Sequence, residues 1–505
     1  MRIFGILYLD DKRTDIDKKG NHLKKFQSLY NNTNMIIKTK RKDMHRTYCI
    51  INDDNMSVNE YVNINEITNE LLEKMATCNW TMKINHNNLR KDSKEIEKLN
   101  YLNVDYTPNR INYDAEIISV DPDGCEDIDD AISYKIINNQ IEIGIHIADP
   151  TSYIEFNSEL SKEFMNRCES VYLDRTYHMI PENIGKLISL KKGEIKRAYS
   201  LIITFDSCNI MNISDLIKNK NYKYKFIKTN IFVKENLSYE DFTRNLHNKN
   251  YKDIYDIGYN ICNGLKVDNN NYDSHKMIGG YMILCNHLAS NHTFIHRINK
   301  IKEIKEIKNN IIESDKLYQL YKNCFNESAN YIINDNNSNI IHESIGLSYT
   351  HFTSPMRRYI DFLNHYIIFN QITDFNKIIE PDKIIFLDKI NNIHKYYKKI
   401  YNIRNINCLI ENKNNIIING TIIFIELNKI RVLINNLIIN IKIFNKKILE
   451  NKIIEVISQN ESEIIFKYKD NQIKFELFQS INIEIYKNKM EINPFRFIID
   501  KIYFF

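Results

Sequence analysis

Six acidic side chains crowd into one short stretch of the sequence, SVDPDGCEDIDDAI, between Asp121 and Asp130. Hydrophobic runs flank the stretch, AEIISV before it and AISYKII after it, so we expect the acids at strand ends, at the edge of a core. Carboxylates this close repel one another, and a divalent cation such as Mg2+ removes that penalty because it prefers carboxylate oxygens. Four of the acids follow the spacing D-x5-D-x-D-D: Asp121, Asp127, Asp129 and Asp130.

Two other interpretations of this acidic stretch compete with a catalytic metal site. A calcium-binding EF-hand loop would need Gly at its sixth position and Glu at its twelfth, where this sequence has Glu126 and Ile132. A solvated acidic turn is the second alternative, and composition alone leaves it open. The hydrophobic flanks favour a site, and two metal ions about 4 Å apart are a common arrangement for phosphodiester hydrolysis.

A second motif, SYTHFTSPMRRYIDFLNHYI, carries two adjacent cations. Ser354 is a good N-cap and Pro355 a good first helical residue, so the spacing predicts a helix from this point. Arg357 and Arg358 would then lie in the first turn, where a cation costs about 0.3–1 kcal/mol. That placement makes sense if the turn receives a phosphate. The alternative is a local salt bridge from either arginine to Asp361.

The composition bounds the kind of protein. A chain of 505 residues with 43% hydrophobic and 26% charged residues predicts about three globular domains. The net charge of +5 permits a polyanion as partner. Nine cysteines without a CxxC pair argue against a zinc ribbon and indicate a reducing, intracellular and cytoplasmic setting. No signal peptide, membrane helix or P-loop is expected, and hence no ATP-driven step.

The chain divides by pattern into three predicted domains. Residues 1–100 combine short β-patterned runs with one helical stretch, which indicates a cold-shock or OB-like region of one small barrel or a barrel and a half. Residues 101–412 hold the motifs, and IEIGIHIADP with its strict alternation predicts one arm of an antiparallel hairpin turning at Asn138-Asn139. Residues 413–505 show regular short strands, which favour a small OB-fold-like barrel.

Taken together, the two motifs resemble the RNB domain of the ribonuclease II/R family of exoribonucleases. The resemblance covers residues 105–410 and also includes IGIHIADPTSYI, SVYLDRTYHMIP, SLKKGEIKRAYS and LSYEDF. It implies a multidomain fold, with an α/β (α+β) RNB catalytic domain flanked by small β-barrel (OB-fold-like) domains. It implies processive 3′→5′ hydrolysis of single-stranded RNA to nucleoside 5′-monophosphates by a two-metal mechanism with Mg2+, or Mn2+ in its place. We expect a monomer without a membrane partner; a helicase or exosome-like partner is left open.

The resemblance also implies a role for each matching residue. Asp129 would be the acid most needed for chemistry, and Arg357 would contact the scissile phosphate with Arg358 beside it. Tyr239, in LSYEDF, would lie near the RNA 3′ end, and Tyr172 would stack on terminal bases, although core packing is the alternative for both tyrosines. The implied metal ligands are Asp121, Asp127, Asp129 and Asp130, with Asp127 in a supporting role. We interpret His146 and Asp149 as structural, and support of a metal ligand is the alternative for Asp149.

Two departures from the family pattern leave a rival function open. Gly279 and Gly280 stand where the family usually has acidic residues before a helix, and YNIRNIN around Ile403 lacks an expected glutamate. A catalytically inactive RNA-binding subunit on the same scaffold is therefore the alternative. An unrelated two-metal DNA nuclease or polymerase is a third reading, which the HFTSPMRRY motif disfavours.

Overall fold

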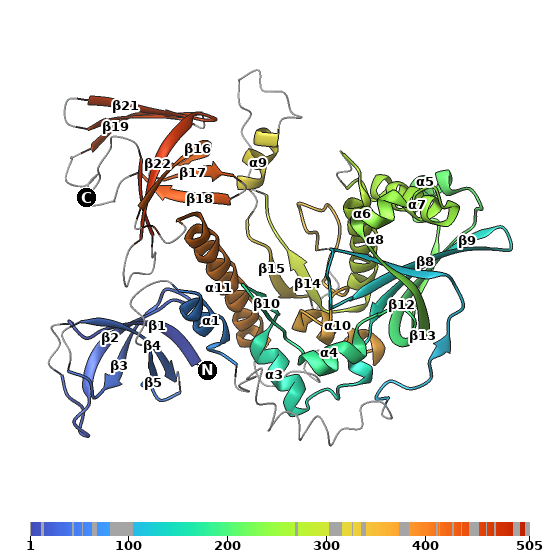
Figure 1. The fold of residues 1–505 in the computed structure, drawn as a ribbon, viewed down its shortest axis with the longest axis horizontal. Coiled ribbons are helices and arrows are strands. Elements are labelled where there is room, and N and C mark those ends of the chain that lie inside the picture. Colours follow the sequence, from blue (N-terminus) through green and yellow to red (C-terminus); the bar gives the residue numbers. More distant parts are fainter. Residues whose placement is uncertain are drawn as a thin grey trace. The chain divides into compact units, whose positions relative to one another are not determined.

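The fold is described from a computed structural model (Figure 1). It describes residues 2–11, 15–42, 45–52, 54–62, 68–80, 105–267, 271–301, 316–325, 327–334, 340–372, 383–410, 413, 415–426, 429–435, 437–443, 454–460, 462–468, 471–487 and 495–499. The chain forms two compact units, described separately below. One comprises Met1–Asn79, Asn299–Ala329 and Lys395–Phe505, and the other comprises Trp80–Ile298 and Asn330–His394.

The N-terminal strands of the first unit close into a barrel in the order β1-β2-β3-β5-β4. Apolar side chains such as Ile3, Leu7 and Phe26 fill the interior of this barrel. Helix α1 (Asn69–Thr77) follows, capped by the Thr68 side chain. The strands are β1 (Arg2–Tyr8), β2 (His22–Ser28), β3 (Asn34–Thr39), β4 (Arg46–Asn52) and β5 (Ser57–Val62).

The C-terminal strands of the first unit form two sheets, in the orders β18-β17-β16-β22-β23 and β19-β20-β21. Helix α9 (Lys316–Cys324) packs against β16 through Tyr321 and Phe424. Helix α11 (Lys383–Ile410) contributes residues to both units. The strands are β16 (Asn415–Glu426), β17 (Lys429–Ile434), β18 (Leu437–Lys442), β19 (Ile454–Gln459), β20 (Glu463–Tyr468), β21 (Asn471–Glu476), β22 (Ser480–Lys487) and β23 (Phe495–Ile499).

The second unit is built on one sheet in the order β12-β9-β8-β7-β13-β6, and an additional β12–β13 pairing closes it on itself. The predicted hairpin is confirmed: β8 and β9 pair in antiparallel register across Asn138-Asn139, both with positive φ. Its alternating isoleucines are fully buried. The strands are β6 (Ile111–Asn112), β7 (Ile117–Asp121), β8 (Asp130–Ile137), β9 (Gln140–Ala148), β12 (Ile195–Phe205) and β13 (Lys223–Ser238).

Helices α5 to α8 gather against the β8–β9–β12–β13 side of this sheet (Figure 1), and their apolar faces share one core with the β9 isoleucines. The helices of the unit are α3 (Glu159–Arg167), α4 (Glu182–Ile188), α5 (Ile213–Lys218), α6 (Tyr239–Arg244), α7 (Lys249–Leu265), α8 (Ser274–Ala289) and α10 (Tyr359–Phe369). The short elements are β10 (Val171–Tyr172), β11 (Thr176–Tyr177), β14 (Ile295–Ile298), β15 (Asn330–Ile333), η1 (Pro150–Ser152), η2 (Ile210–Asn212) and η3 (Ser290–His292).

The predicted start of the arginine-bearing helix is wrong. Helix α10 begins at Tyr359, so Arg357 and Arg358 precede it. Ser354 does not cap the helix, because the N-cap residue is Arg358; the Ser354 N–H donates to the Asp361 carboxylate and its hydroxyl oxygen accepts from Arg357. Arg358 is extended, with φ −135° and ψ 127°, and ends a turn in which its N–H donates to the Ser354 carbonyl. The two cations therefore lie in the turn that leads into α10, and not in its first helical turn.

A second correction concerns Gly279 and Gly280, which lie inside α8 and not before it. Gly280 permits close packing of α7 against α8, because a Cβ there would come within 2.6 Å of Cys262 Sγ. Both predicted domain boundaries, 100–101 and 412–413, include residues outside the described parts of the chain, so they stay predictions. No helix among the described residues is long and apolar enough to cross a membrane.

Candidate active site

All the predicted site residues line one pocket of about 830 Å³ in the second unit. Its acidic wall is the loop between β7 and β8, and its basic wall is the turn before α10. Because β7 and β8 are hydrogen-bonded neighbours, the end of one and the start of the other bring the acids together. The lining residues that the sequence predicted are Asp121, Asp127, Asp129, Asp130, Tyr172, Tyr239, Arg357 and Arg358.

Asp129 joins the acidic and basic walls. Its carboxylate accepts hydrogen bonds from the Met356 N–H and from Arg357 Nε, each at 3.1 Å. Burial raises the pKa of Asp129 to about 7, although Arg357 acts in the opposite direction. Asp129 is 4% exposed, whereas the Arg357 side chain is 45% exposed. Asp129 therefore fixes one edge of a guanidinium that still faces the pocket.

Asp121 and Asp130 form an acidic pair whose repulsion Arg357 offsets only in part. Burial raises the pKa of Asp121 to about 6, and burial together with Asp121 raises the pKa of Asp130 well above its usual range. Among the described residues, Asp121 Oδ2 is buried and accepts no hydrogen bond. An orphaned carboxylate oxygen beside a second carboxylate is a donor set that suits a hard divalent cation.

Asp127 has a partner that the sequence did not predict. His178 Nδ1 lies 2.7 Å from Asp127 Oδ2, and this hydrogen bond raises the pKa of His178. Asp127 is hydrogen-bonded to His178, and Asp129 to Arg357. In the described parts of the chain, no three Asp, Glu, His or Cys side chains lie close enough together to hold a metal ion. Mg2+ is, however, commonly held by one or two carboxylates plus substrate phosphate oxygens, which the Asp121–Asp130 pair matches.

Arg358 has the local salt bridge that the sequence analysis left open. Its Nε and one terminal nitrogen donate to the two Asp361 oxygens, each at 2.8 Å, and Asp361 is fully buried. Arg357 makes no such contact with Asp361; it pairs with Asp129 instead. A direct contact of Arg358 with RNA stays a prediction.

The two tyrosines also line the pocket. Tyr239 is the first residue of α6, and burial together with Asp130 and Asp121 raises its pKa to about 12, so the phenol stays protonated. Tyr172 on β10 is 43% exposed, which argues against core packing for this ring. Both rings therefore lie where a ligand in the pocket can reach them.

The comparisons with known proteins agree with this geometry. The family model described as RNB domain matches residues 110–257 and 256–374, more than half of the chain. The chain belongs to the RNB domain family. It is 29% identical over 349 residues to ribonuclease R of Ureaplasma parvum serovar 3, an alignment that covers 54% of this chain and 48% of the relative. The chain thus spans about half the length of that relative.

Solved structures show the same RNB-containing fold. RNase R of Mycoplasma genitalium, in complex with ribose-methylated single-stranded RNA, superimposes with a TM-score of 0.63 at 15% identity, covering 99% of this chain and 100% of that one. Yeast Ssd1, a pseudonuclease, superimposes with a TM-score of 0.67 at 13% identity, covering 99% and 83%. The predicted fold class, an RNB domain flanked by small β domains, is confirmed.

One residue of this RNB domain that the sequence analysis missed holds the basic wall in place. Asn286 on α8 accepts from the Phe352 N–H at 2.8 Å and donates to the Tyr349 hydroxyl at 2.9 Å and the Thr353 hydroxyl at 3.3 Å. It therefore ties the segment before Arg357 to the helix. The sequence signal that could have indicated Asn286 is that it is the one amide side chain in the apolar run YMILCNHLA.

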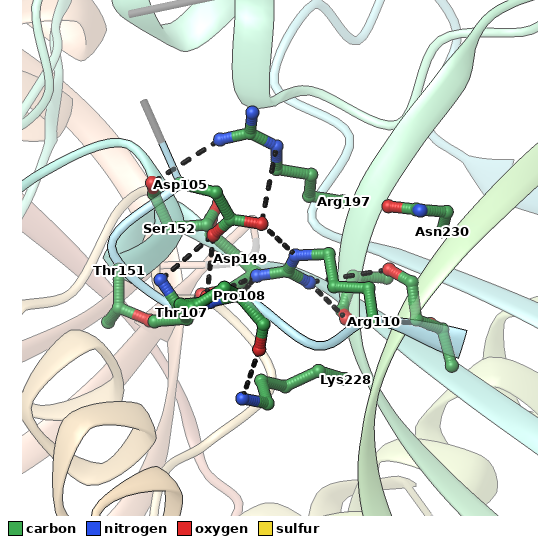
Figure 2. Close-up of polar contacts among 12 residues, drawn as sticks. Asp105, Thr107, Pro108, Arg110, Asp149, Thr151, Ser152, Arg197, Lys228 and Asn230 are labelled. Carbon is green, nitrogen blue, oxygen red and sulfur yellow. Dashed lines mark hydrogen bonds and ion pairs between the residues drawn. The ribbon is translucent and has the colours of Figure 1, made fainter. Parts of the chain in front are cut away.

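Two polar residues of the RNB domain that the sequence analysis interpreted as structural lie in buried polar contacts away from the pocket. His146 lies inside the closed sheet between Ser133 Oγ at 2.9 Å and Ser200 Oγ at 2.7 Å. Asp149 forms a buried ion pair with Arg110, which also bonds the Asp105 carboxylate at 2.9 Å (Figure 2). Neither residue lines the pocket.

Proposed function

We propose that this chain is a metal-dependent exoribonuclease that hydrolyses single-stranded RNA processively from the 3′ end to nucleoside 5′-monophosphates. One observation carries the proposal: the unpaired Asp121–Asp130 carboxylates face the same pocket as the half-exposed Arg357 guanidinium. An anionic diester needs both, a cation held by the acids and a fixed guanidinium for the charge that develops in the transition state.

Asp121 and Asp130 would hold the ion, Mg2+ or Mn2+, with Asp127 and Asp129 as the further predicted ligands. When bound, the ion supplies Lewis-acid polarisation of the phosphate and lowers the pKa of a bound water. The buried unpaired oxygen of Asp121 and the raised pKa of Asp130 support this assignment, because a cation would relieve both.

The chain's own groups would bind and orient the RNA. Arg357 would donate to the scissile phosphate, and Asp129 would keep its guanidinium in place. The protonated Tyr239 phenol would donate a hydrogen bond near the 3′ terminus, and Tyr172 would stack on a base. Arg358, held by Asp361, would support this turn and contribute to the RNA backbone contact only secondarily.

We also propose how the chain recognises RNA, and where in the cell it works. Phosphate contacts predict binding that weakens with salt, and 2′-hydroxyl contacts would reject DNA. We propose a monomer that works in the cytoplasm, with a helicase or exosome-like partner as an optional addition. The similar fold of an RNase R that binds single-stranded RNA supports an RNA substrate.

A second function has its own support. The similar yeast protein Ssd1 is a pseudonuclease, and this chain has Gly279, Gly280 and the acid-free YNIRNIN segment where the family pattern has acids. An inactive RNA-binding subunit would keep the pocket and lose only cleavage. The retained aspartates and Arg357 favour the active enzyme.

One gel-based cleavage assay distinguishes the active enzyme from the inactive RNA-binding subunit. Unaltered protein and Asp129→Asn are incubated with 5′-labelled single-stranded RNA and Mg2+, beside a matched DNA. The active enzyme shortens the RNA to a small end product and leaves the DNA whole, while Asp129→Asn binds RNA without cutting it. If neither protein cuts in Mg2+ or Mn2+ although both bind RNA, the inactive subunit is the function.

A further inference from the structure

A second hollow of about 810 Å³ lies in the RNB domain, and it shares no residue with the acidic pocket. Strand β13 forms its floor with β12, and the end of α10 and η3 complete its wall. Its rings come from four elements, and most of them are half-buried or exposed. The aromatic side chains that line it are Tyr199, Tyr224, Phe226, His292 and Phe369.

These rings do not pair off face to face. Phe226 and His292 meet edge to face with centroids 5.7 Å apart, and Tyr224 meets His292 in the same way at 5.8 Å. Tyr199 and Phe369 are also T-shaped, at 6.5 Å. Ring surface that other rings do not stack upon is what a planar base needs for stacking.

The hollow is also cationic. Between Asp215 and Glu235 the chain carries six lysines and no acid, and two of these lysines, Lys223 and Lys225, alternate with Tyr222, Tyr224 and Phe226 in NYKYKFIK. Lys225 is exposed at the hollow, and no carboxylate in the described parts of the chain pairs with it. Basic residues interleaved with aromatics match the phosphate and base of a nucleotide together.

A second lysine is held in place by the hollow itself. The Lys228 ammonium donates to the Pro108 carbonyl (Figure 2) and lies 4.2 Å from the Phe369 ring centroid. The network around Arg110 fixes the loop that presents Pro108. Burial lowers the pKa of Lys228, with Arg110 adding to the effect, and an anion bound beside this ammonium would relieve that unfavourable charge.

We propose that this hollow binds one nucleotide unit, with its base against Tyr224, Phe226 or Phe369 and its phosphate on Lys225 and Lys228. The unit is either a free nucleoside 5′-monophosphate or one residue of an RNA strand that also reaches the acidic pocket. Only the RNA-strand alternative rests on the proposed function, because a free nucleotide can bind in this hollow whether or not the chain cuts RNA.

Photocrosslinking tests the site on the full chain carrying Asp129→Asn, in EDTA, so that no RNA is consumed. The probes are 5-iodouridine 5′-monophosphate and a short single-stranded oligomer of 5-iodouridine, and the labelled peptides are mapped by mass spectrometry. We expect label on Tyr224 or Phe226. Label from the monophosphate identifies a free-nucleotide site, and label from the oligomer alone identifies an RNA contact. If neither probe labels residues 222–228, the proposal is wrong.

A matched pair of charge changes tests specificity. Lys225→Glu should reduce the labelling about tenfold, whereas Lys218→Glu, an equal change on α5 outside the hollow, should alter it less than roughly twofold. Equal losses in both variants would mean general attraction to a basic surface and would overturn the site. With Asp129 intact, the unaltered protein should shorten 5′-labelled single-stranded RNA in Mg2+. If it does not, the proposed function fails while the crosslinking result stands.

Discussion

Two aspartate–arginine contacts in the RNB domain use the same residue types to opposite effect. Asp149 and Arg110 are both buried, and each has a further polar partner: the Thr107 hydroxyl donates to Asp149, and Arg110 donates to Asp105 (Figure 2). Asp129 is equally buried, but its partner Arg357 is half-exposed and two further carboxylates, Asp121 and Asp130, lie in the same pocket.

The pKa directions express this difference. Burial alone would raise the pKa of Asp149, but Arg110 and the Thr151 hydroxyl lower it below its usual range. In the acidic pocket, burial dominates and the pKa of Asp129 rises to about 7. A compensated pair stabilises the fold, whereas an uncompensated cluster is costly unless a ligand completes it. The comparison therefore separates a structural contact from a candidate functional one.

The largest expected effect is on activity in the acidic pocket. Asp129→Asn should lower RNA hydrolysis about a thousandfold, because it removes a charge that orients Arg357 and contributes to the metal site. The fold should survive, since the Asn oxygen can still accept from the Met356 N–H. The control is Asp123→Asn, the same change at an exposed acid of the same loop, which should cleave normally. Equal losses in the two variants would contradict the assignment.

The compensated pair should show the reverse pattern. Asp149→Asn leaves the buried Arg110 without its main partner, so the free energy of unfolding should fall by about 3–5 kcal/mol. Asp105→Asn, which removes the more exposed partner of the same arginine, should cost about 1 kcal/mol. Urea denaturation measures both. A loss at Asp149 no larger than that at Asp105 would contradict the account of this pair.

The two adjacent arginines sharpen the comparison further. Arg357→Lys should lower activity about a hundredfold with little change in stability, because a lysine cannot reproduce the guanidinium fork. Arg358→Lys should instead cost about 1–3 kcal/mol of stability, because the fully buried Asp361 loses a bidentate partner. Single-turnover cleavage measures the activity of both variants, and urea denaturation measures their stability. Equal losses of activity and of stability in the two variants would contradict the separate roles of Arg357 and Arg358.

The smallest effect is a pH dependence of stability from His146. Burial lowers the pKa of His146 to about 3, so below pH 6.5 the unfolded chain binds a proton that the folded chain does not. Stability from this residue is therefore complete above about pH 6.5 and falls at about 1.4 kcal/mol per pH unit below it. Between pH 6.5 and 5, Asp149 contributes little change, because its loss begins near its unfolded pKa of about 3.9. His146→Gln should have a shallower slope in urea denaturation; an unchanged slope would refute this.

The sequence predicted the parts of the fold that local patterns determine. The β8–β9 hairpin follows from alternating isoleucines and Asn138-Asn139, and the acidic loop follows from its hydrophobic flanks. The parallel pairing of β7 with β13, which joins residues more than a hundred positions apart, has no local pattern. Which of the two arginines faces the pocket could not be predicted from the sequence, because their ion-pair partners depend on where α10 begins. With the helix starting at Tyr359, Arg358 pairs with Asp361 and Arg357 pairs with Asp129. His178 had no sequence pattern that distinguished it.

We expect the carboxylates of Asp121 and Asp130 in the acidic pocket to hold a divalent cation. Mn2+ binding, followed by electron paramagnetic resonance without RNA, tests it on unaltered protein, Asp130→Asn and the control Asp105→Asn. Unaltered protein and Asp105→Asn should bind Mn2+ alike, and Asp130→Asn should bind it at least about tenfold more weakly. No Mn2+ binding to the unaltered protein, or equal binding by all three, would contradict it.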